Sequence, residues 1–416
     1  MQLSSRADAS RRSRLAIFLA VMGPGLVAML ADTDAGSVVT AAQSGARWGY
    51  HLLLLQLVLV PILYLVQELT VRLGVATQKG HGELIRDVFG PSWAWLSVST
   101  LMLACVGALV TEFSGIAGVG LLFGVSPWLT VPVFVVLLLA VVYTGSYRRV
   151  ELAAILMGLG EFAFLGVAVA AHPDPGLITS DMLHFPLSNP RYMFLLAANI
   201  GAVIMPWMIF YQQSAVVDKG LTAEHLRSAR VDTALGAVLT QLVMAAVLVG
   251  TAATIGTANP RAPLNTVQQI ADAITPFLGI GVGRMVFSLG MLGASLVAAI
   301  VVSLTAAWGL GEVAGYRRSL AHRPLEAPWF YGVFTASLLL GAAVVLSGVN
   351  LVNLSVAVEV MNALLLPLVL GFLFQLARRA LPPPYRLSGA YGWTVGAVIV
   401  LTTAMGLFAG LAGILG

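Results

Sequence analysis

About eleven apolar stretches, each roughly 20 residues long, follow one another along the 416-residue chain. A helix that crosses a bilayer needs this length, and it bonds all its backbone polar groups internally. Only 10% of the residues are charged, against about a quarter in a typical soluble domain. We therefore predict an all-α polytopic membrane protein with a single transmembrane domain over residues 1–416. The stretches lie near 15–46, 50–73, 94–124, 128–146, 150–171, 192–217, 233–256, 280–311, 328–348, 352–377 and 390–415.

Lysine and arginine collect on one side of the predicted membrane. With the N-terminus in the cytoplasm, 18 of the 22 basic residues fall in cytoplasmic connections and four fall outside. This asymmetry is typical of proteins inserted in a cell (inner) membrane with a cytoplasmic N-terminus. An odd number of spans then places the C-terminus outside. The basic start leads into an apolar segment long enough to remain as the first span, so we predict no cleaved signal peptide.

Several classes of protein are excluded by composition and motifs. The one cysteine, Cys105, excludes internal disulfides and thiolate metal clusters. The basic residues form no face interleaved with aromatic residues, which argues against nucleic acid as a partner. The sequence contains no HExxH motif, no P-loop and no intramembrane Ser/His/Asp set. We therefore predict neither an enzyme nor a cofactor-binding protein.

Two predicted spans contain interruptions at mid-depth. The first reads GPGLVAMLADTDAGSVVTAAQSGA, and the sixth reads LLAANIGAVIMPWMIFYQQSAVV with Pro206 in its middle. We predict non-helical backbone around 32–37 and 201–206, because polar residues and proline disfavour helix there. A proline alone is compatible with an ordinary kink. Matching breaks in the first helix of two five-helix groups are typical of transporters with inverted repeats and a site at the midplane.

Five acidic residues lie inside the predicted spans without a basic residue at comparable depth. Intramembrane acids are costly and indicate cation binding, protonation or both. We favour Asp34 as a cation ligand. Asp32 fits either a functional role or a cap of the helix that follows. For Glu161 we expect a hydrogen bond to a neighbouring helix. The five acids are Asp32, Asp34, Glu112, Glu161 and Glu359.

The sequence resembles the Nramp family of proton-coupled divalent metal transporters over essentially its whole length. The matching motifs are GPGLVA…DTDAGS, QELTVRLGVATQKGHGELIRD, TEFSG, SYRRVE, GAVIMPW and DT at 232–233. The resemblance implies a LeuT-type fold with two inverted five-helix repeats, about 15–171 and 192–377, and an extra helix at about 390–415. It also implies that metal binds, as substrate, between the unwound parts of helices one and six.

The family's metal-binding motifs have counterparts here, with departures. The family's D-P-G-N in helix one corresponds to 34–37, so the aspartate is kept as Asp34 and the asparagine ligand is replaced by Ser37. The family's A-x-x-M-P-H in helix six corresponds to 202–207. The resemblance therefore implies metal contacts from the Ala202 carbonyl and the Met205 sulfur. Trp207 replaces the histidine associated with proton movement in the family.

Other positions of the family's proton path are also altered. The glutamate of helix three corresponds to Glu112, and a second histidine of helix six corresponds to Gln212. A helix-ten glutamine that reaches the ion in many members aligns with Glu359, so the resemblance implies Glu359 as a further metal ligand. We place Glu112, Asp32, Trp207 and Gln212 on the proton path or around the metal ligands, and we predict weak or absent proton coupling.

The substrate is left open between two classes. A thioether favours soft transition ions, whereas carboxylate and hydroxyl groups favour Mg²⁺ or Mn²⁺. The departures resemble the Nramp-related magnesium transporter branch, so we predict a secondary transporter of divalent ions of the Mn²⁺ or Mg²⁺ class, functional as a monomer. The alternative is a LeuT-fold transporter of a small organic solute that has lost the metal site, with an amine of the solute paired to Asp34.

Overall fold

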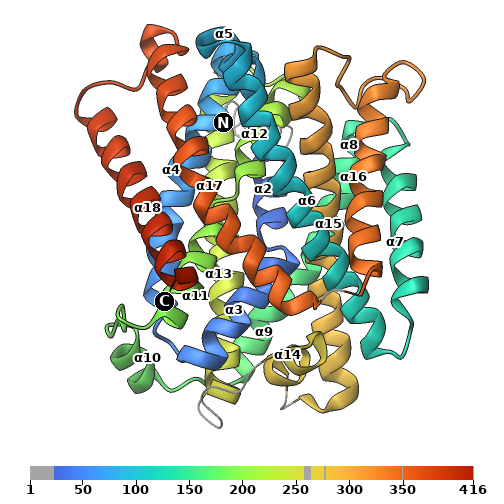
Figure 1. Cartoon of the computed structure of the whole chain (residues 1–416), viewed down its shortest axis with the longest axis vertical. Helices are drawn as coiled ribbons and strands as arrows, with labels where there is room; N and C mark the ends of the chain where they lie inside the picture. The colour runs from blue at the N-terminus through green and yellow to red at the C-terminus, as the bar shows by residue number, and fades with distance from the viewer. Residues whose placement is uncertain (1–22, 257–263, 276–277, 349, 416) are drawn as a thin grey trace, which may run out of the picture.

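A computed structural model describes residues 23–256, 264–275, 278–348 and 350–415 of the chain (Figure 1). Within these ranges every regular element is a helix. The first half contains α2 (Pro24–Asp32), α3 (Ala35–Trp48), α4 (Leu53–Thr77), α5 (His81–Phe89), α6 (Pro91–Leu122), α7 (Pro127–Val142), α8 (Tyr147–Gly158), η1 (Leu159–Phe162), α9 (Ala163–Ala170) and α10 (Pro175–Asp181). The second half contains α11 (Pro190–Val203), α12 (Pro206–Asp218), η2 (Ala223–His225), α13 (Leu226–Thr251), η3 (Ala252–Gly256), α14 (Val267–Ile274), α15 (Ile280–Ala314), α16 (Pro328–Leu346), α17 (Leu351–Arg379), η5 (Pro383–Tyr385) and α18 (Gly389–Leu415).

Nine helical segments of the described ranges are long and apolar enough to cross a membrane, with α8–α9 and α11–α12 each counted as one segment. Two further predicted spans correspond to α7, which is apolar but has 16 residues, and to the interrupted pair α2–α3. Large apolar side chains face outward, such as Val169 at 76% and Phe408 at 66% exposure. Such surfaces are disfavoured in water and suit lipid. The predicted polytopic all-α architecture is confirmed, while residues 15–22 of the first predicted span lie outside the described ranges.

Both predicted helix breaks are present, and both are shorter than predicted. Only Thr33 and Asp34 separate α2 from α3, and only Ile204 and Met205 separate α11 from α12. Met205 is extended, with φ −91° and ψ 141°, as the residue before a proline prefers. Pro206 then begins α12, because its fixed φ and missing N–H suit the first position of a helix. Our wider ranges were wrong because helix continues up to each break and restarts directly after it.

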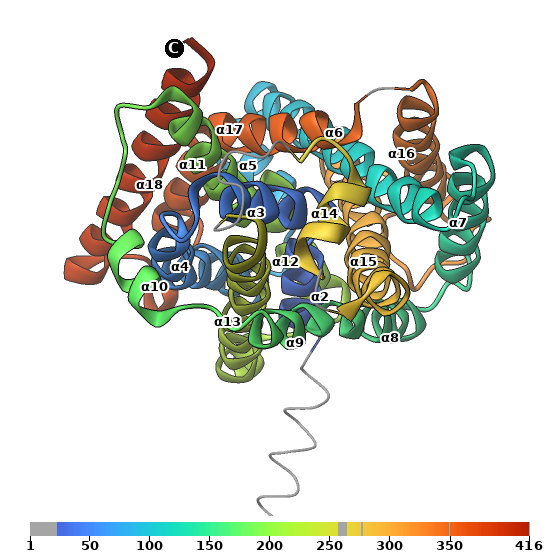
Figure 2. The same ribbon diagram turned by 90° about the horizontal axis from the view of Figure 1, so that it is seen from below.

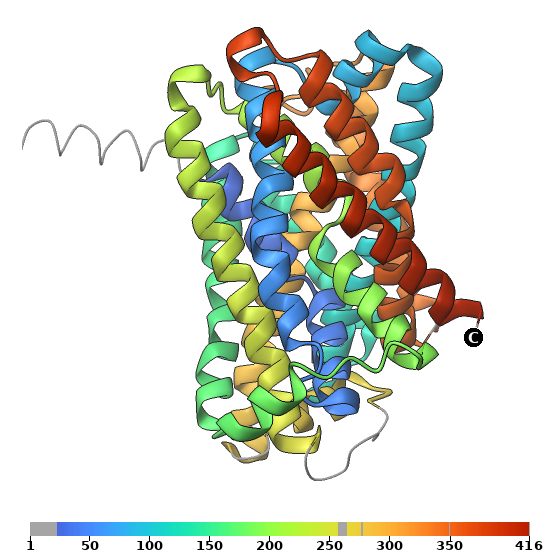
Figure 3. The ribbon, with the colours of Figure 1, turned by 90° about the vertical axis from the view of Figure 1, so that its left-hand side faces the viewer.

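The broken helices lie at the centre of the bundle. Figure 2 views the bundle from one end, with α2, α3 and α12 inside, α18 at one edge and α7 and α16 at the opposite edge. α2 and α3 both pack against α13, and α11 packs against α17 and α18. In Figure 3, α18 runs obliquely along the outside of this group. The residues of both breaks are therefore buried inside the bundle.

A short helix also forms between α13 and α15. α14 packs its apolar face against α6 and α15 and exposes Gln269 and Asp272. Thr266 caps it, and Gln269 completes a capping box. α14 therefore lies with its apolar face against the bundle and its polar face outward.

Candidate cation site at the helix breaks

Asp34 is fully buried at the first break and has one oxygen without a partner. Its Oδ1 atom accepts the Ser37 backbone N–H at 2.7 Å, which makes Asp34 the N-cap of α3. Its Oδ2 atom has no hydrogen-bond partner. Of the two roles left open for Asp32, the cap is excluded, because Asp32 is the last residue of α2. The cap therefore fixes the Asp34 side chain and leaves its second oxygen available.

A hydrogen bond joins the two breaks. The Ser37 hydroxyl donates to the Ala202 carbonyl at 3.0 Å. No backbone N–H of α11 is available to bond this carbonyl, because α11 ends one residue later at Val203. Each of the two oxygens keeps a lone pair after this bond. Ser37 and Ala202, which are far apart in sequence, thus lie together.

Glu359 on α17 reaches the same point from a third helix. Its Oε2 atom accepts a hydrogen bond from Asn362 at 3.0 Å, and its Oε1 atom has no partner. A Cβ at Gly36 would collide with the Glu359 carboxyl and would lie 3.4 Å from Asp34 Oδ1. A Cβ at Gly201 would collide with the Glu359 main-chain carbonyl. Two glycines therefore allow the Glu359 and Asp34 carboxyl groups to converge.

Glu112 holds the backbone of the first break. Its Oε2 atom accepts the Ala35 N–H at 3.2 Å, and its Oε1 atom accepts the Thr111 hydroxyl at 3.2 Å. Its carboxyl also interacts electrostatically with those of Asp34 and Glu359. Ala35 starts α3, so the positive end of this helix faces two carboxyl groups. The structure thus places Glu112 beside Asp34, next to the predicted ligands.

The sulfur of Met205 is engaged by its neighbour in the second break. The Trp207 indole N–H donates to Met205 Sδ at 3.0 Å, and both side chains are fully buried. One lone pair of the Met205 sulfur therefore already accepts a hydrogen bond. This contact was not predicted, because two residues that flank a proline meet only in the bent conformation seen here.

Gln212 lies farther along α12, between two other helices. Its Nε2 atom donates to the Thr233 hydroxyl at 2.7 Å, and its Oε1 atom accepts from Thr70 at 3.5 Å. It therefore joins α12 to α13 and α4, and these bonds do not bring it to Asp34.

Asp32 and Glu161 lie on the α2 side of the break. Asp32 Oδ2 accepts the Thr240 hydroxyl at 3.4 Å, and Thr240 is also 2.7 Å from the Thr33 hydroxyl. Glu161 interacts with the Thr33 side chain, but neither of its oxygens has a hydrogen-bond partner. Glu161 therefore contacts the first break through Thr33.

Sequence reasoning missed two polar partners, Asn362 and Thr240. Asn362 lies three residues after Glu359, a spacing that places both on one face of a helix. That spacing could have identified it. Thr240 comes from α13, and no local pattern links it to Asp32.

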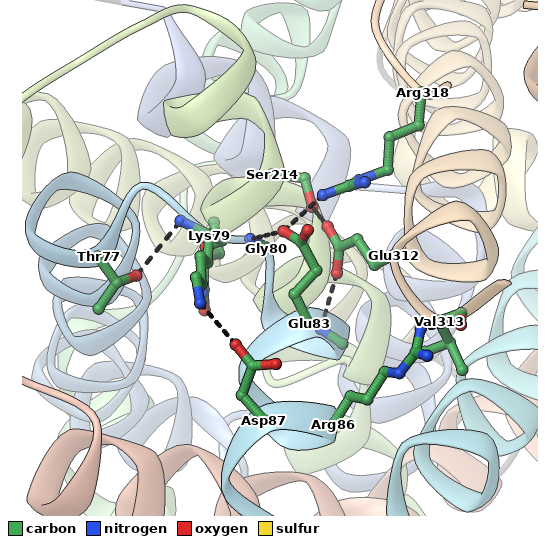
Figure 4. Close-up of polar contacts among 12 residues, drawn as sticks. Thr77, Lys79, Gly80, Glu83, Arg86, Asp87, Ser214, Glu312, Val313 and Arg318 are labelled. Atoms are coloured by element: carbon green, nitrogen blue, oxygen red, sulfur yellow. Dashed lines mark hydrogen bonds and ion pairs between the residues drawn. The ribbon is translucent and has the colours of Figure 1, made fainter. Parts of the chain in front are cut away.

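Sequence reasoning also missed a network of polar contacts at the end of the bundle that carries α5 (Figure 4). Glu312 accepts the Gly82 N–H at 2.7 Å and the Ser214 hydroxyl at 2.5 Å. Glu83 pairs with Arg318 at 2.5 Å. A cavity of about 200 Å³ lies between α12 and α15 beside these residues. The motif at 67–87 could have indicated this network of polar contacts, but we used the motif only for the family resemblance.

The donors at the breaks are of mixed type. In the described ranges, no group of three or more His, Cys, Asp or Glu side chains could hold a metal ion. What converges instead is a pair of carboxyl groups with a hydroxyl and a main-chain carbonyl, and a thioether in the second break. Such a set can bind a partly hydrated cation.

Solved structures with a similar fold are transporters. A manganese transporter from Eremococcus coleocola matches with a TM-score of 0.72 and 22% identity, over 96% of this chain and 88% of that one. MhsT, solved in complex with L-phenylalanine, matches with a TM-score of 0.66 and 14% identity, over 96% and 98%. Together with the two broken helices, these matches define a LeuT-type membrane transporter fold, as predicted.

The sequence comparisons identify the family. The model of the family described as natural resistance-associated macrophage protein-like matches residues 25–410. A divalent metal cation transporter, MntH, of Yersinia pestis is 30% identical over 310 residues, which cover 73% of this chain and 75% of the relative. The Brucella suis MntH is 27% identical over 298 residues, or 69% and 65% of the two chains. The chain belongs to the Nramp family.

Family membership confirms two further predictions. The chain belongs to a family of membrane transporters, so it is not an enzyme. Its named relatives are divalent metal cation transporters, and such proteins carry the ion as substrate and not as a cofactor.

Proposed function

We propose that this protein carries divalent metal ions of the Mn²⁺ or Mg²⁺ class across the membrane by alternating access. One observation carries the proposal: Asp34 and Glu359 converge over Gly36, and each has a buried oxygen without a partner. Such oxygens are costly in a protein interior unless a cation or proton joins them. The names of the relatives, divalent metal cation transporters, support the same function.

The proposed ligands come from three helices. The free carboxyl oxygens of Asp34 and Glu359 supply charge. The remaining lone pairs of the Ser37 hydroxyl and Ala202 carbonyl supply neutral oxygen. Met205 supplies sulfur at the edge of the site. Because these groups sit on both broken helices, relative movement of the two would open the site to one side of the membrane or the other.

The balance of ligands favours a hard ion. Two carboxyl groups and two neutral oxygens suit Mg²⁺ or Mn²⁺. The sulfur of Met205 is weakened as a ligand, because it already accepts the Trp207 N–H. Mg²⁺ commonly keeps several waters when bound, so the small Ser37 side chain leaves room for them.

Proton coupling is weak or absent in this proposal. Trp207 and Gln212 have no proton to exchange near neutral pH. Any proton would then have to use Glu112 or Asp32, beside the same acids that bind the ion. With a pH-sensitive dye in proteoliposomes, we expect divalent ion uptake to leave luminal pH unchanged. Strong, ion-dependent acidification would contradict this part of the proposal.

The protein's placement and organisation are also proposed. The excess of basic residues supports a cytoplasmic N-terminus, with the C-terminus outside, in a cell (inner) membrane. In this orientation the α5 end of the bundle faces the cytoplasm. The repeats run over about 15–171 and 192–377, with the extra helix at about 390–415. Since the proposed ligands all come from one chain, a monomer is sufficient for binding.

Calorimetry on purified protein tests the proposed substrate. We expect Mn²⁺ or Mg²⁺ to bind the native chain, and Asp34→Asn to weaken this binding at least a hundredfold while the protein stays monodisperse. Asp272→Asn, at an exposed acid of α14, is the matched control and should bind as the native chain does. Unchanged affinity in Asp34→Asn, or binding of an organic amine instead of metal, would contradict the proposal.

A further inference from the structure

A second group of buried oxygens lies on the other side of the first break. Asp32 ends α2, Thr33 lies in the break, Thr240 comes from α13, and Glu161 comes from η1 between α8 and α9. The Thr33 and Thr240 hydroxyls are 2.7 Å apart, and Thr240 lies 3.4 Å from Asp32 Oδ2. Glu161 interacts with the Thr33 side chain and, electrostatically, with the carboxyl groups of Asp32 and Asp34. Segments distant in sequence thus direct only oxygen atoms to one place.

Three of the four carboxyl oxygens in this cluster have no hydrogen-bond donor. Asp32 Oδ1 and both oxygens of Glu161 have no hydrogen-bond partner, although each side chain is only 1% exposed. No ion pair of the described ranges includes either residue. Burial of a carboxylate without donors is strongly unfavourable. The three unpartnered oxygens are therefore available to a cation.

The position of Glu161 is fixed by close packing. Its helix tightens into the short 3₁₀ turn η1 between α8 and α9. A Cβ at Gly160 would collide with the Leu289 carbonyl of α15, and a Cβ at Gly293 would collide with the Met157 carbonyl. Two glycines thus hold this turn directly against α15. The Glu161 side chain is not free to leave the cluster by a simple shift of its helix.

The helix ends distinguish this cluster from the site around Asp34. Asp34 caps the N-terminus of α3, where the helix dipole is positive. Asp32 lies at the C-terminus of α2, where the dipole is negative and the last carbonyls lack helical partners. The dipole therefore attracts a cation to the Asp32 side. The cluster also contains no sulfur, so its donors are all hard.

We propose that Asp32, Thr33, Glu161 and Thr240 form a second cation site, separate from the proposed transport site, that binds a hard cation. Two carboxylates balance the charge of one divalent ion such as Mg²⁺ or Mn²⁺. Na⁺ is held by the same oxygens with one negative charge left over. The experiment distinguishes these ions, because the chemistry of the donors is common to them.

The test counts bound ions on the full purified chain. Calorimetric titrations with Mg²⁺, with Mn²⁺ and with Na⁺ are run on the native protein and its variants. We expect two sites in total on the native chain. Glu161→Gln removes the second site, or weakens it at least tenfold, and keeps the site at Asp34. Asp34→Asn does the reverse, so failure of the transport-site assignment is distinguished from failure of this one.

A second variant keeps the proposal testable if Glu161→Gln misfolds. Thr240→Val keeps the shape of the side chain and removes its hydroxyl, and we expect a tenfold loss at the second site. Thr402→Val is its matched control, because Thr402 is equally buried on α18 and lies outside both sites. A single site for all three ions in the native chain would overturn the proposal. Two sites that both survive Glu161→Gln and Thr240→Val would also overturn it.

Discussion

Buried acids occur both at the α5 end of the bundle and at the helix breaks, with different surroundings. At the α5 end, Glu68 accepts hydrogen bonds from Arg72 and from Arg230, and the closest N···O distances of the two ion pairs are 2.6 and 2.7 Å. Glu312 accepts a backbone N–H and the Ser214 hydroxyl (Figure 4). Each of these carboxyl groups is bonded through both of its oxygens.

At the helix breaks the carboxyl groups of Asp34 and Glu359 are bonded through one oxygen only. One oxygen of Asp34 caps α3 and one oxygen of Glu359 accepts from Asn362, while the second oxygen of each is without a partner. The hydrogen bonds hold the carboxyl groups in place without consuming them. The comparison teaches that full pairing serves to join helices, whereas partial pairing orients charge toward a ligand. Substitutions at the α5 end should therefore mainly reduce stability, whereas substitutions at the helix breaks should mainly reduce ion affinity.

The largest expected effect is on stability, at the paired end. Arg72→Met leaves the buried Glu68 with one partly exposed arginine, and loss of one member of a buried ion pair costs about 3–5 kcal/mol. We expect a loss of this size in the free energy of unfolding, measured in detergent micelles. Asp34→Asn should cost less than about 1 kcal/mol, because asparagine is also a good N-cap. The exposed Arg191→Met is the control, and equal losses in all three variants would break the comparison.

The next effect is a pH dependence at the same end. His81 lies in α5, bonded to Gln213 at 2.9 Å and stacked edge-on against Phe210. Burial lowers the pKa of His81 from 6.5 to about 4. Because the unfolded chain binds the proton more readily, stability is complete above pH 6.5 and falls progressively toward pH 4, by up to about 3 kcal/mol.

A single variant isolates this dependence. His81→Asn keeps a donor to Gln213 and removes the titrating group, so its unfolding free energy should lose less between pH 6.5 and pH 4 than that of the native chain. The measurement is the difference between the two proteins at each pH, which cancels the other titrating acids. A difference that stays constant with pH would show that His81 does not contribute.

A smaller effect is expected for Gly36→Ala at the breaks. The added methyl occupies the place of the Glu359 carboxyl, so the two acids can no longer converge. We expect divalent ion affinity to fall about tenfold to a hundredfold, or about 1.4 to 2.8 kcal/mol, by calorimetry. Gly371→Ala on α17 is the control, since a Cβ there meets open space. Unchanged divalent ion affinity in Gly36→Ala would show that Glu359 is not part of the site.

The smallest effect is expected for Ser37→Ala. It removes one neutral oxygen and the hydrogen bond to the Ala202 carbonyl, a contribution of about 1 kcal/mol. We expect divalent ion affinity to fall by less than tenfold with the ion preference kept. Ser99→Ala, on the exposed face of α6, should have no effect. A loss as large as that of Asp34→Asn would mean that Ser37 and not the carboxylate dominates binding.

The spans and both breaks could be predicted because hydropathy and proline act locally. The role of Asp34 as cap could not, because two aspartates two residues apart fit the same pattern until the helix start is known. The contacts of Glu359 with Gly36, and of Glu112 with Ala35, join helices that are far apart in sequence. Tertiary packing determines such contacts, and the hydrophobic periodicity of a single sequence does not encode them. Trp207 was identified as a departure from the family, but its bond to Met205 depends on the bend at Pro206.

Transport in proteoliposomes tests the central claim most directly. Purified protein is reconstituted with a divalent-sensitive dye inside, and Mn²⁺ or Mg²⁺ is added outside. We expect the native chain to admit at least one of these ions, and Asp34→Asn to reduce its uptake to the level of protein-free vesicles. The Asp272→Asn control should retain native uptake. Full uptake by Asp34→Asn, or no divalent uptake by the native chain, would contradict the assignment of this break as the transport site.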